Sequence, residues 1–278
     1  MKTHVLYLYL VLLFPFGALA QGSIKRSGLS LDTIRVEGRV GLAITIKDLP
    51  GQRFVLEIPE VFILRDFKNG LFNYNNQVWN YTRKGAEMNF EDEQYKYSIK
   101  LRTRRSRKDV SVKWDMAFRN KTDKSLYDLT AFNCWTMNTA PLFKDLNMER
   151  TFVHDSSGRE LLLRDVRKTQ GDGRRTMQFY SSVEGVDLSK SPWASQWAVS
   201  SNQPLSGKQI SVVSTDSSWI FENKVDGQVA YFFNNWEQDH GCVHASPLFA
   251  NELKPGASAR AKGSFTFRKL SDNRNLKL

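Results

Sequence analysis

The segment Asp109–Arg119, which reads DVSVKWDMAFR, decides the fold class of this chain. Apolar and polar side chains alternate along it, a pattern typical of a β-strand with one face in a core and the other in solvent. The alternation returns in Ala259–Arg268, after a Pro255-Gly256 turn. Both segments therefore predict long strands whose apolar face packs against a second sheet.

Shorter segments repeat the period of two between turns rich in Gly, Pro, Asp and Ser. No window sustains the apolar spacing of an amphipathic helix over three turns, although Pro141–Arg150 could form a short helix. We therefore expect an all-β fold, an antiparallel β-sandwich. Its further strands are expected at Ile34–Val40, Leu42–Ile46, Phe54–Ile58, Tyr95–Leu101, Asp128–Phe132, Thr176–Tyr180, Gln209–Val213, Trp219–Phe221 and Val229–Phe233.

The first twenty residues have the features of a signal peptide. Lys2 precedes an apolar run from Val5 to Phe16, and Ala18-Leu19-Ala20 offers a small-x-small cleavage site. The run is shorter than the roughly 18 residues that a membrane-spanning helix needs. We therefore expect residues 1–20 to be removed and residues 21–278 to form a single domain, secreted or periplasmic, with no integral membrane segment.

The composition excludes several classes of protein. The 278 residues include 12% aromatics but only 8 Pro and 17 Gly, which argues against a disordered or collagen-like chain. The 40 basic and 29 acidic residues give a net charge of +11, and loss of Lys2 leaves +10. A basic protein outside the cytoplasm is expected to meet an acidic saccharide rather than nucleic acid.

The excess charge is concentrated between Lys100 and Lys108, where six of nine residues are basic. If the strand from Tyr95 continues, Lys100, Arg102 and Arg104 share one face. Guanidinium groups bind carboxylates and sulfates with two parallel hydrogen bonds. The alternative is a solvated hairpin tip. The run lacks regularly interleaved aromatics, so we expect no nucleic-acid partner.

The segment from Asn234 to Pro247 is the densest in unusual side chains. In an extended backbone His240, Cys242 and His244 would project from the same side. They could then ligate a soft or borderline metal such as Zn²⁺, but their spacing matches no established zinc signature, so no metal or other cofactor is expected. Either histidine could instead act as a general base, or both could be structural.

The two cysteines, Cys134 and Cys242, can pair in only one way. An oxidising compartment would favour that disulfide, and the bridge would remove the Cys242 thiolate from any metal site. The alternative is two buried free thiols, since Cys is among the most buried residue types. Both possibilities stay open at this point.

Two stretches, CVHASP at 242–247 and LKPGAS at 253–258 before a last strand, carry a family resemblance. They resemble poorly characterised exported bacterial β-sandwich proteins. Those proteins are similar in layout to the galactose-mutarotase-like sandwiches of saccharide-processing enzymes. The resemblance implies a large sandwich and a carbohydrate ligand. The catalytic His and Glu motifs of the mutarotases match no position here, so it implies no catalytic residue.

Aromatic and amide side chains recur together in this chain, a combination that suits a sugar groove, although core packing explains any single aromatic as well. We therefore predict a protein that binds or degrades an acidic polysaccharide or oligosaccharide, as a lyase-type enzyme or as a non-catalytic binding or structural envelope protein. The oligomeric state stays open. The catalytic candidates are His240, His244, Tyr74 and Tyr81, and the substrate-binding candidates are Arg102, Arg104, Trp79, Asn76, Trp135 and Trp236.

Overall fold

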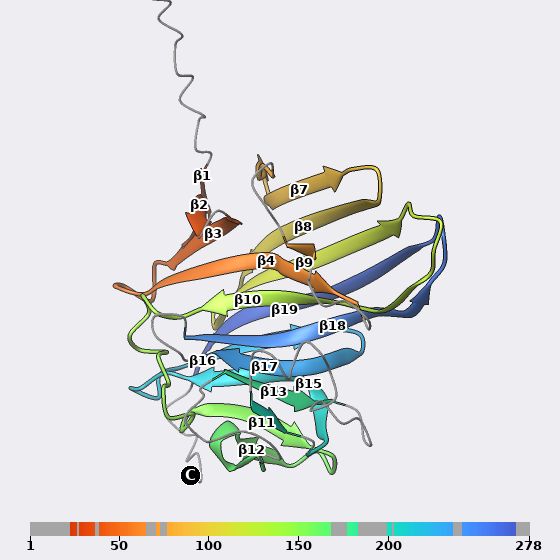
Figure 1. Ribbon diagram of the computed structural model, residues 1–278. Coiled ribbons are helices and arrows are strands. Elements are labelled where there is room, and N and C mark those ends of the chain that lie inside the picture. The colour runs from red at the N-terminus through yellow and green to blue at the C-terminus, as the bar shows by residue number, and fades with distance from the viewer. Residues whose placement is uncertain are drawn as a thin grey trace, which may run out of the picture.

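Two β-sheets form a sandwich in the computed structural model of this protein (Figure 1), which confirms the all-β prediction. Among the described strands, neighbours are antiparallel except for one parallel pair, β13 (Met177–Ser181) with β14 (Val199–Ser201). No helix in the described part of the chain is long and apolar enough to cross a membrane. The structure describes residues 23–26, 28–36, 39–64, 71–72, 77–167, 177–182, 199–201, 203–235 and 241–270.

The first sheet has ten strands in the order β1-β2-β3-β4-β10-β18-β17-β13-β14, and β5 pairs with β4. Its centre joins β10 to β18, two strands that are far apart in the sequence. Its remaining strands are β1 (Ser23–Arg26), β2 (Leu29–Val36), β3 (Arg39–Ile46), β4 (Arg53–Ile63), β5 (Leu71–Phe72), β10 (Leu126–Thr136), β17 (Val229–Asn235) and β18 (Cys242–Leu253).

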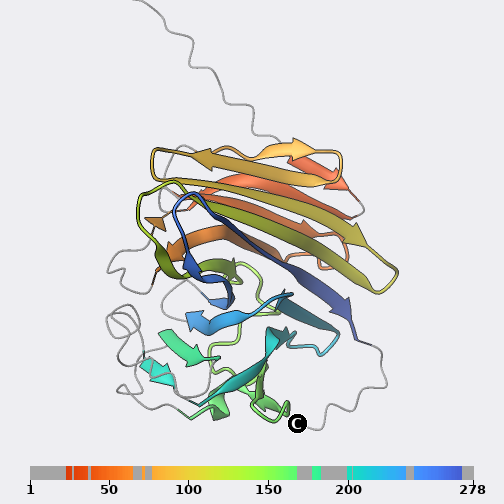
Figure 2. The same cartoon turned by 90° about the vertical axis from the view of Figure 1, so that its right-hand side faces the viewer.

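The second sheet has nine strands in the order β12-β11-β15-β16-β19-β9-β8-β7-β6. Figures 1 and 2, two views at right angles, show the β2–β4 and β7–β8 end opposite the end that carries β11 and β12. The strands of the second sheet are β6 (Asn80–Thr82), β7 (Gly85–Glu91), β8 (Tyr95–Arg105), β9 (Asp109–Asn120), β11 (Thr151–Asp155), β12 (Glu160–Leu162), β15 (Leu205–Val213), β16 (Trp219–Val225) and β19 (Ser258–Lys269).

Aromatic side chains fill the space between the sheets. Trp135 of β10 is fully buried, and its ring lies 4.9 Å from Phe221 of β16 and 4.8 Å from Phe265 of β19. Trp114 and Phe118 point inward from β9 into the same core cluster. The alternating segments that predicted the fold are therefore β9 and β19, which pair with each other along almost their whole length.

Two predictions about local structure are wrong. Pro141–Arg150 forms turns rather than a helix, and the described ranges contain only one 3-10 turn, η1 (Leu163–Asp165). The expected strand Ile34–Val40 is divided between β2 and β3, because the chain reverses between Val36 and Arg39. The extended backbone on which the shared side of Cys242 and His244 depended is present, since β18 begins at Cys242.

Candidate functional site

The outer face of the first sheet, which points away from the second sheet, carries an unusual set of side chains. Trp135 and Val243 are cross-strand partners, and both belong to the core between the sheets. Side chains alternate along a strand, so Cys134 on β10 and the pair Cys242 and His244 on β18 project from the opposite face. All three are nevertheless buried, with relative exposures of 4% or less.

These three side chains form what we call the thiol–histidine cluster: Cys134, Cys242 and His244. Their sulfur and ring nitrogen atoms all lie within 4.8 Å of one another. The Nε2 atom of His244 lies 3.1 Å from the sulfur of Cys242. Cys134 also contacts the hydroxyl of Thr136, with its sulfur 3.4 Å from Oγ1. The sequence prediction that Cys242 and His244 share a side is therefore correct.

Aromatic rings enclose the His244 imidazole. Its centroid lies 5.1 Å from that of Phe132 on β10 and 4.9 Å from that of Phe233 on β17. Burial lowers the pKa of His244 to about 3, so the imidazole is neutral near pH 7. The hydrogen bond with Cys242 and burial together raise the pKa of the Cys134 thiol. The cluster is thus an uncharged group of two thiols and one imidazole.

A buried ion pair lies on the same face, next to the cluster. Glu57 on β4 is the cross-strand partner of Cys134, and its carboxylate lies 2.5 Å from the Nε atom of Arg39 on β3. A second carboxylate, that of Glu60, lies 3.9 Å from the same guanidinium. Arg39 therefore neutralises the Glu57 carboxylate, which has little contact with water.

The structure holds Cys134 and Cys242 as buried free thiols, so of the two possibilities left open by the sequence the disulfide is not formed. The register gives the reason, because Thr136 rather than Cys134 lies directly opposite Cys242. Diagonal positions on neighbouring strands are about 7–8 Å apart. A disulfide needs Cβ atoms about 3.5–4.5 Å apart.

The second candidate region is the basic face, which we define as Lys100, Arg102 and Arg104 on β8 and Lys113 on β9. Alternation places these four side chains on the outer face of the second sheet, opposite the inward-pointing Ile99, Leu101 and Trp114. All four are exposed, and Arg102 lies directly across from Lys113. None of them makes an ion pair with a described residue, whereas Arg105 pairs with Asp48 at 2.7 Å. The predicted shared face of Lys100, Arg102 and Arg104 is confirmed.

A hollow beside Arg102 extends the basic face. It has a volume of about 320 Å³ and lies where the β6–β7 turn meets β8. Two further cations contribute to its wall, and Glu87 is its one acidic side chain. The lining residues are Thr82, Arg83, Lys84, Glu87, Leu101 and Arg102.

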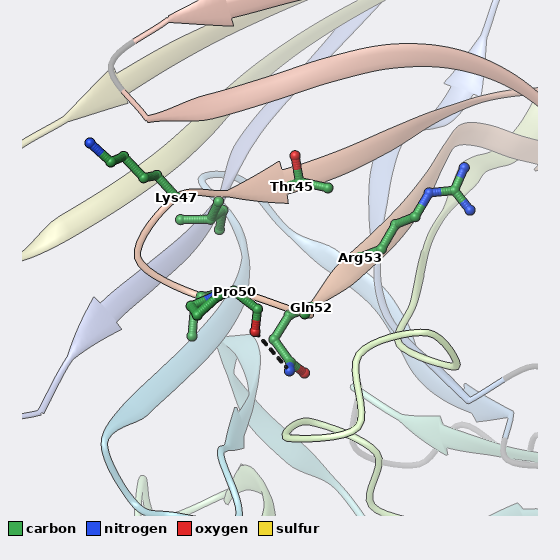
Figure 3. A pocket seen from close by; sticks show the side chains of 8 residues that line it. Thr45, Lys47, Pro50, Gln52 and Arg53 are labelled. Carbon is green, nitrogen blue, oxygen red and sulfur yellow. Dashed lines mark hydrogen bonds between the residues drawn. The ribbon is translucent and has the colours of Figure 1, made fainter.

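A different hollow, at the turn between β3 and β4, does not gather its charges. Figure 3 shows Lys47 and Arg53 pointing away from each other on either side of that turn. The Gln52 amide nitrogen lies 3.5 Å from the carbonyl oxygen of Pro50, so the turn bonds to itself. Two divergent cations offer no joint contact to one anion, and we assign no site there.

The remaining candidates fall in three places. Tyr81 lies at the edge of the sandwich, where its hydroxyl is 2.7 Å from Oγ1 of Thr33, and burial raises its pKa. Trp79 and Trp135 have exposures of 4% and 0%, so they are core residues. The prediction that they form a surface for sugars is therefore wrong. The other four candidates, His240, Tyr74, Asn76 and Trp236, lie outside the described residues.

Among the described residues of the predicted lyase, His244 does not come together with the two arginines. His244 lies on the outer face of the first sheet, whereas Arg102 and Arg104 lie on the outer face of the second. Both sheets separate them, and stacked sheets alone are about 10 Å apart. An imidazole there cannot remove a proton next to a carboxylate held by these arginines.

Sequence reasoning missed two residues that the structure makes prominent. Lys113 belongs to the alternating segment, but only the pairing of β8 with β9 shows that it faces Arg102. The sequence indicates Cys134 as half of a disulfide or as a buried free thiol, whereas β10 places it beside His244. The alternation with Trp135 predicts on which side of the strand Cys134 lies. It does not predict that His244 is its neighbour across the sheet.

Comparison with known proteins gives distant structural likeness only. No protein-family model and no curated protein matches the chain. Among solved structures, it is similar to an Escherichia coli K12 protein with a provisional description as an aldose 1-epimerase, at 9% identity and a TM-score of 0.46, covering 89% of this chain and 98% of the other. The Slr1438 protein from Synechocystis sp. PCC 6803 follows at 10% identity, a TM-score of 0.45, and 90% and 96% coverage.

A GalM/aldose epimerase homologue from C. elegans is similar at 12% identity and a TM-score of 0.42, with 91% of this chain and 100% of the other covered. The expected distant similarity to galactose-mutarotase-like proteins is confirmed. At these identities no residue role is carried over. The chain is an all-β sandwich with a remote likeness to aldose epimerases.

Proposed function

We propose that this protein binds an acidic carbohydrate, outside the cytoplasm, through its basic face. The observation that carries the proposal is the register of β8 and β9, which places Arg102 directly opposite Lys113 on an exposed surface. Like charges at opposite positions of neighbouring strands destabilise a sheet. A bound anion would relieve this repulsion by contacting both cations.

The spacing of the basic face suits an extended polyanion. Lys100, Arg102 and Arg104 follow one another at every second position of β8, which corresponds to about 7 Å between successive cations. Arginine can hold a carboxylate or sulfate with two hydrogen bonds. The outward positions of β8 and β9 carry no aromatic side chain on which a nucleobase could stack. Uronate or sulfated saccharides therefore match this face better than single-stranded nucleic acid.

The test measures binding of the full chain to uronate, sulfated and neutral polysaccharides, with a single-stranded oligonucleotide as competitor. The variant Arg102→Gln/Arg104→Gln removes two charges from the basic face. The control Lys47→Gln/Arg53→Gln removes two charges from the β3–β4 turn, where the side chains diverge. We expect about a tenfold loss of affinity for acidic saccharides in the first variant, equal to about 1.4 kcal/mol, and little change in the control.

Equal losses of affinity in the two variants would mean that only the net charge of the protein matters, which would contradict the proposal. Tighter binding of the oligonucleotide than of the acidic saccharides would contradict it as well. The same incubations can be followed near 235 nm, roughly where an unsaturated lyase product would absorb. His240 and Tyr74 lie outside the described residues, so a lyase site that uses them stays a prediction for this assay. Binding without product would identify a carbohydrate-binding protein.

A further inference from the structure

The thiol–histidine cluster brings three metal-binding side chains from two strands to one point. We propose that Cys134, Cys242 and His244 bind one zinc ion on the outer face of the first sheet. Thiolate sulfur and imidazole nitrogen are the ligands that zinc prefers. The sequence alone suggested a different trio with His240, and no metal was expected from its spacing. Pairing of β10 with β18 replaces that trio with a set drawn from both strands.

The distances in the cluster fit a tetrahedral ion after small movements. With zinc–sulfur bonds of about 2.3 Å and zinc–nitrogen bonds of about 2.0–2.1 Å, two sulfurs on one ion lie about 3.8 Å apart, and sulfur and nitrogen about 3.6 Å apart. The ligand atoms here all lie within 4.8 Å of one another, and Nε2 of His244 is 3.1 Å from the Cys242 sulfur. Shifts of about 1 Å or less would complete the three contacts.

Charge favours a divalent ion in this buried position. Two thiolates and one divalent cation sum to zero, whereas a monovalent copper ion would leave a net negative charge away from water. A neutral imidazole as third ligand adds no charge to this sum. Its Nδ1 atom has no hydrogen-bond partner among the described residues, so no second bond holds the ring away from the sulfurs.

Three protein ligands leave a fourth position on a tetrahedral ion. The hydroxyl of Thr136, 3.4 Å from the Cys134 sulfur, is an oxygen donor that could take that position. A water molecule would complete the set equally well. The rings of Phe132 and Phe233 beside His244 limit the access of solvent and of chelators.

The test is a cobalt(II) titration of the reduced full chain, purified without a histidine tag, followed by displacement with zinc. We expect one equivalent of cobalt to produce thiolate-to-cobalt charge-transfer absorption, and one equivalent of zinc to abolish it. Cys134→Ser and His244→Gln should each weaken zinc binding at least tenfold. The matched control His154→Gln changes a histidine of β11 in the second sheet and should leave affinity and spectrum unchanged.

A measurement on the chain without substitutions tests the proposal even if a variant fails to fold. Alkylation in mild denaturant should modify both cysteines of the metal-free chain, and added zinc should protect both. Absence of the charge-transfer band, equal zinc affinity in all variants, or a single protected cysteine would overturn the proposal. A purified chain with no titratable thiol would overturn it as well, because the two cysteines would then be joined to each other.

Discussion

The two outer faces of the sandwich differ more than their common architecture suggests. β9 of the second sheet alternates from Val110 to Arg119 between buried residues and residues that are half-buried or exposed, and the exposed basic face lies on this outer side. β10 of the first sheet is buried continuously from Leu129 to Trp135. The outer face of the first sheet is therefore a second buried environment, where polar groups must be paired or neutral, whereas the basic face can keep unpaired cations in water.

Among the changes that distinguish the two outer faces, Arg39→Met is expected to have the largest effect on the free energy of unfolding. The substitution leaves the Glu57 carboxylate, whose side chain is only 4% exposed, without its partner at 2.5 Å. Removing one member of a buried ion pair costs about 3–5 kcal/mol. We expect a loss near the lower end, about 3 kcal/mol, in the free energy of unfolding measured with urea, because Arg39 keeps some contact with water.

The double variant Arg39→Met/Glu57→Gln controls for this interpretation. It removes the uncompensated charge, so it should recover more than half of the stability lost by the single variant. A single variant that costs less than about 0.5 kcal/mol, the range of ordinary surface substitutions, would show that the first sheet's outer face is open to water like the second.

A somewhat smaller effect is expected at Gly85, the cross-strand partner of Arg102. A Cβ atom added there would lie 1.8 Å from the carbonyl oxygen of Leu101, so β7 and β8 would have to move apart. We expect Gly85→Ala to cost about 1–3 kcal/mol in thermal or urea unfolding. Gly227→Ala is the matched control, since its Cβ would meet nothing within 4 Å. Equal stability of the two variants would contradict the close approach of these strands.

The same contrast explains which strands could be predicted from the sequence. β8, β9 and β19 have one wet face, so their side chains alternate and the segments were recognised. β18 is buried on both faces from Cys242 to Ser246, so the period of two disappears there and its extended backbone could be stated only as a condition. Strands that are covered on both sides lose the pattern on which such predictions rest.

The candidate site was predictable to the extent that it is local. Cys242 and His244 lie two residues apart on one strand, and their common side followed from the strand period. Cys134 reaches them only through the pairing of β10 with β18, which no local pattern encodes. Trp135 was misassigned for the same reason, because an aromatic residue shows its partners in the second sheet only once both sheets are in place.

A change of salt concentration should weaken ligand binding at the basic face moderately and leave the contribution of the buried ion pair to stability almost unchanged. Raising the ionic strength from about 0.01 to about 0.15 M shortens the Debye length from about 30 to about 8 Å, which screens exposed charges far more than buried ones. We expect acidic-saccharide binding to weaken about tenfold, equal to about 1.4 kcal/mol. The stability difference between wild type and Arg39→Met should change little. Binding that is insensitive to salt would place the ligand on a less charged surface.

The smallest predicted effect is the change in stability caused by Arg102→Gln. Arg102 is exposed, makes no ion pair with a described residue and faces Lys113, so removing its charge relieves a repulsion. We expect a stabilisation of at most about 0.5 kcal/mol, together with weaker binding of acidic saccharides. Arg260→Gln is the control on the same face. It removes the guanidinium that bonds the Asp115 carboxylate, so its stability change should have the opposite sign. Destabilisation by both variants would mean that Arg102 has a stabilising partner, and the basic face would then lack the unpaired charge on which ligand binding depends.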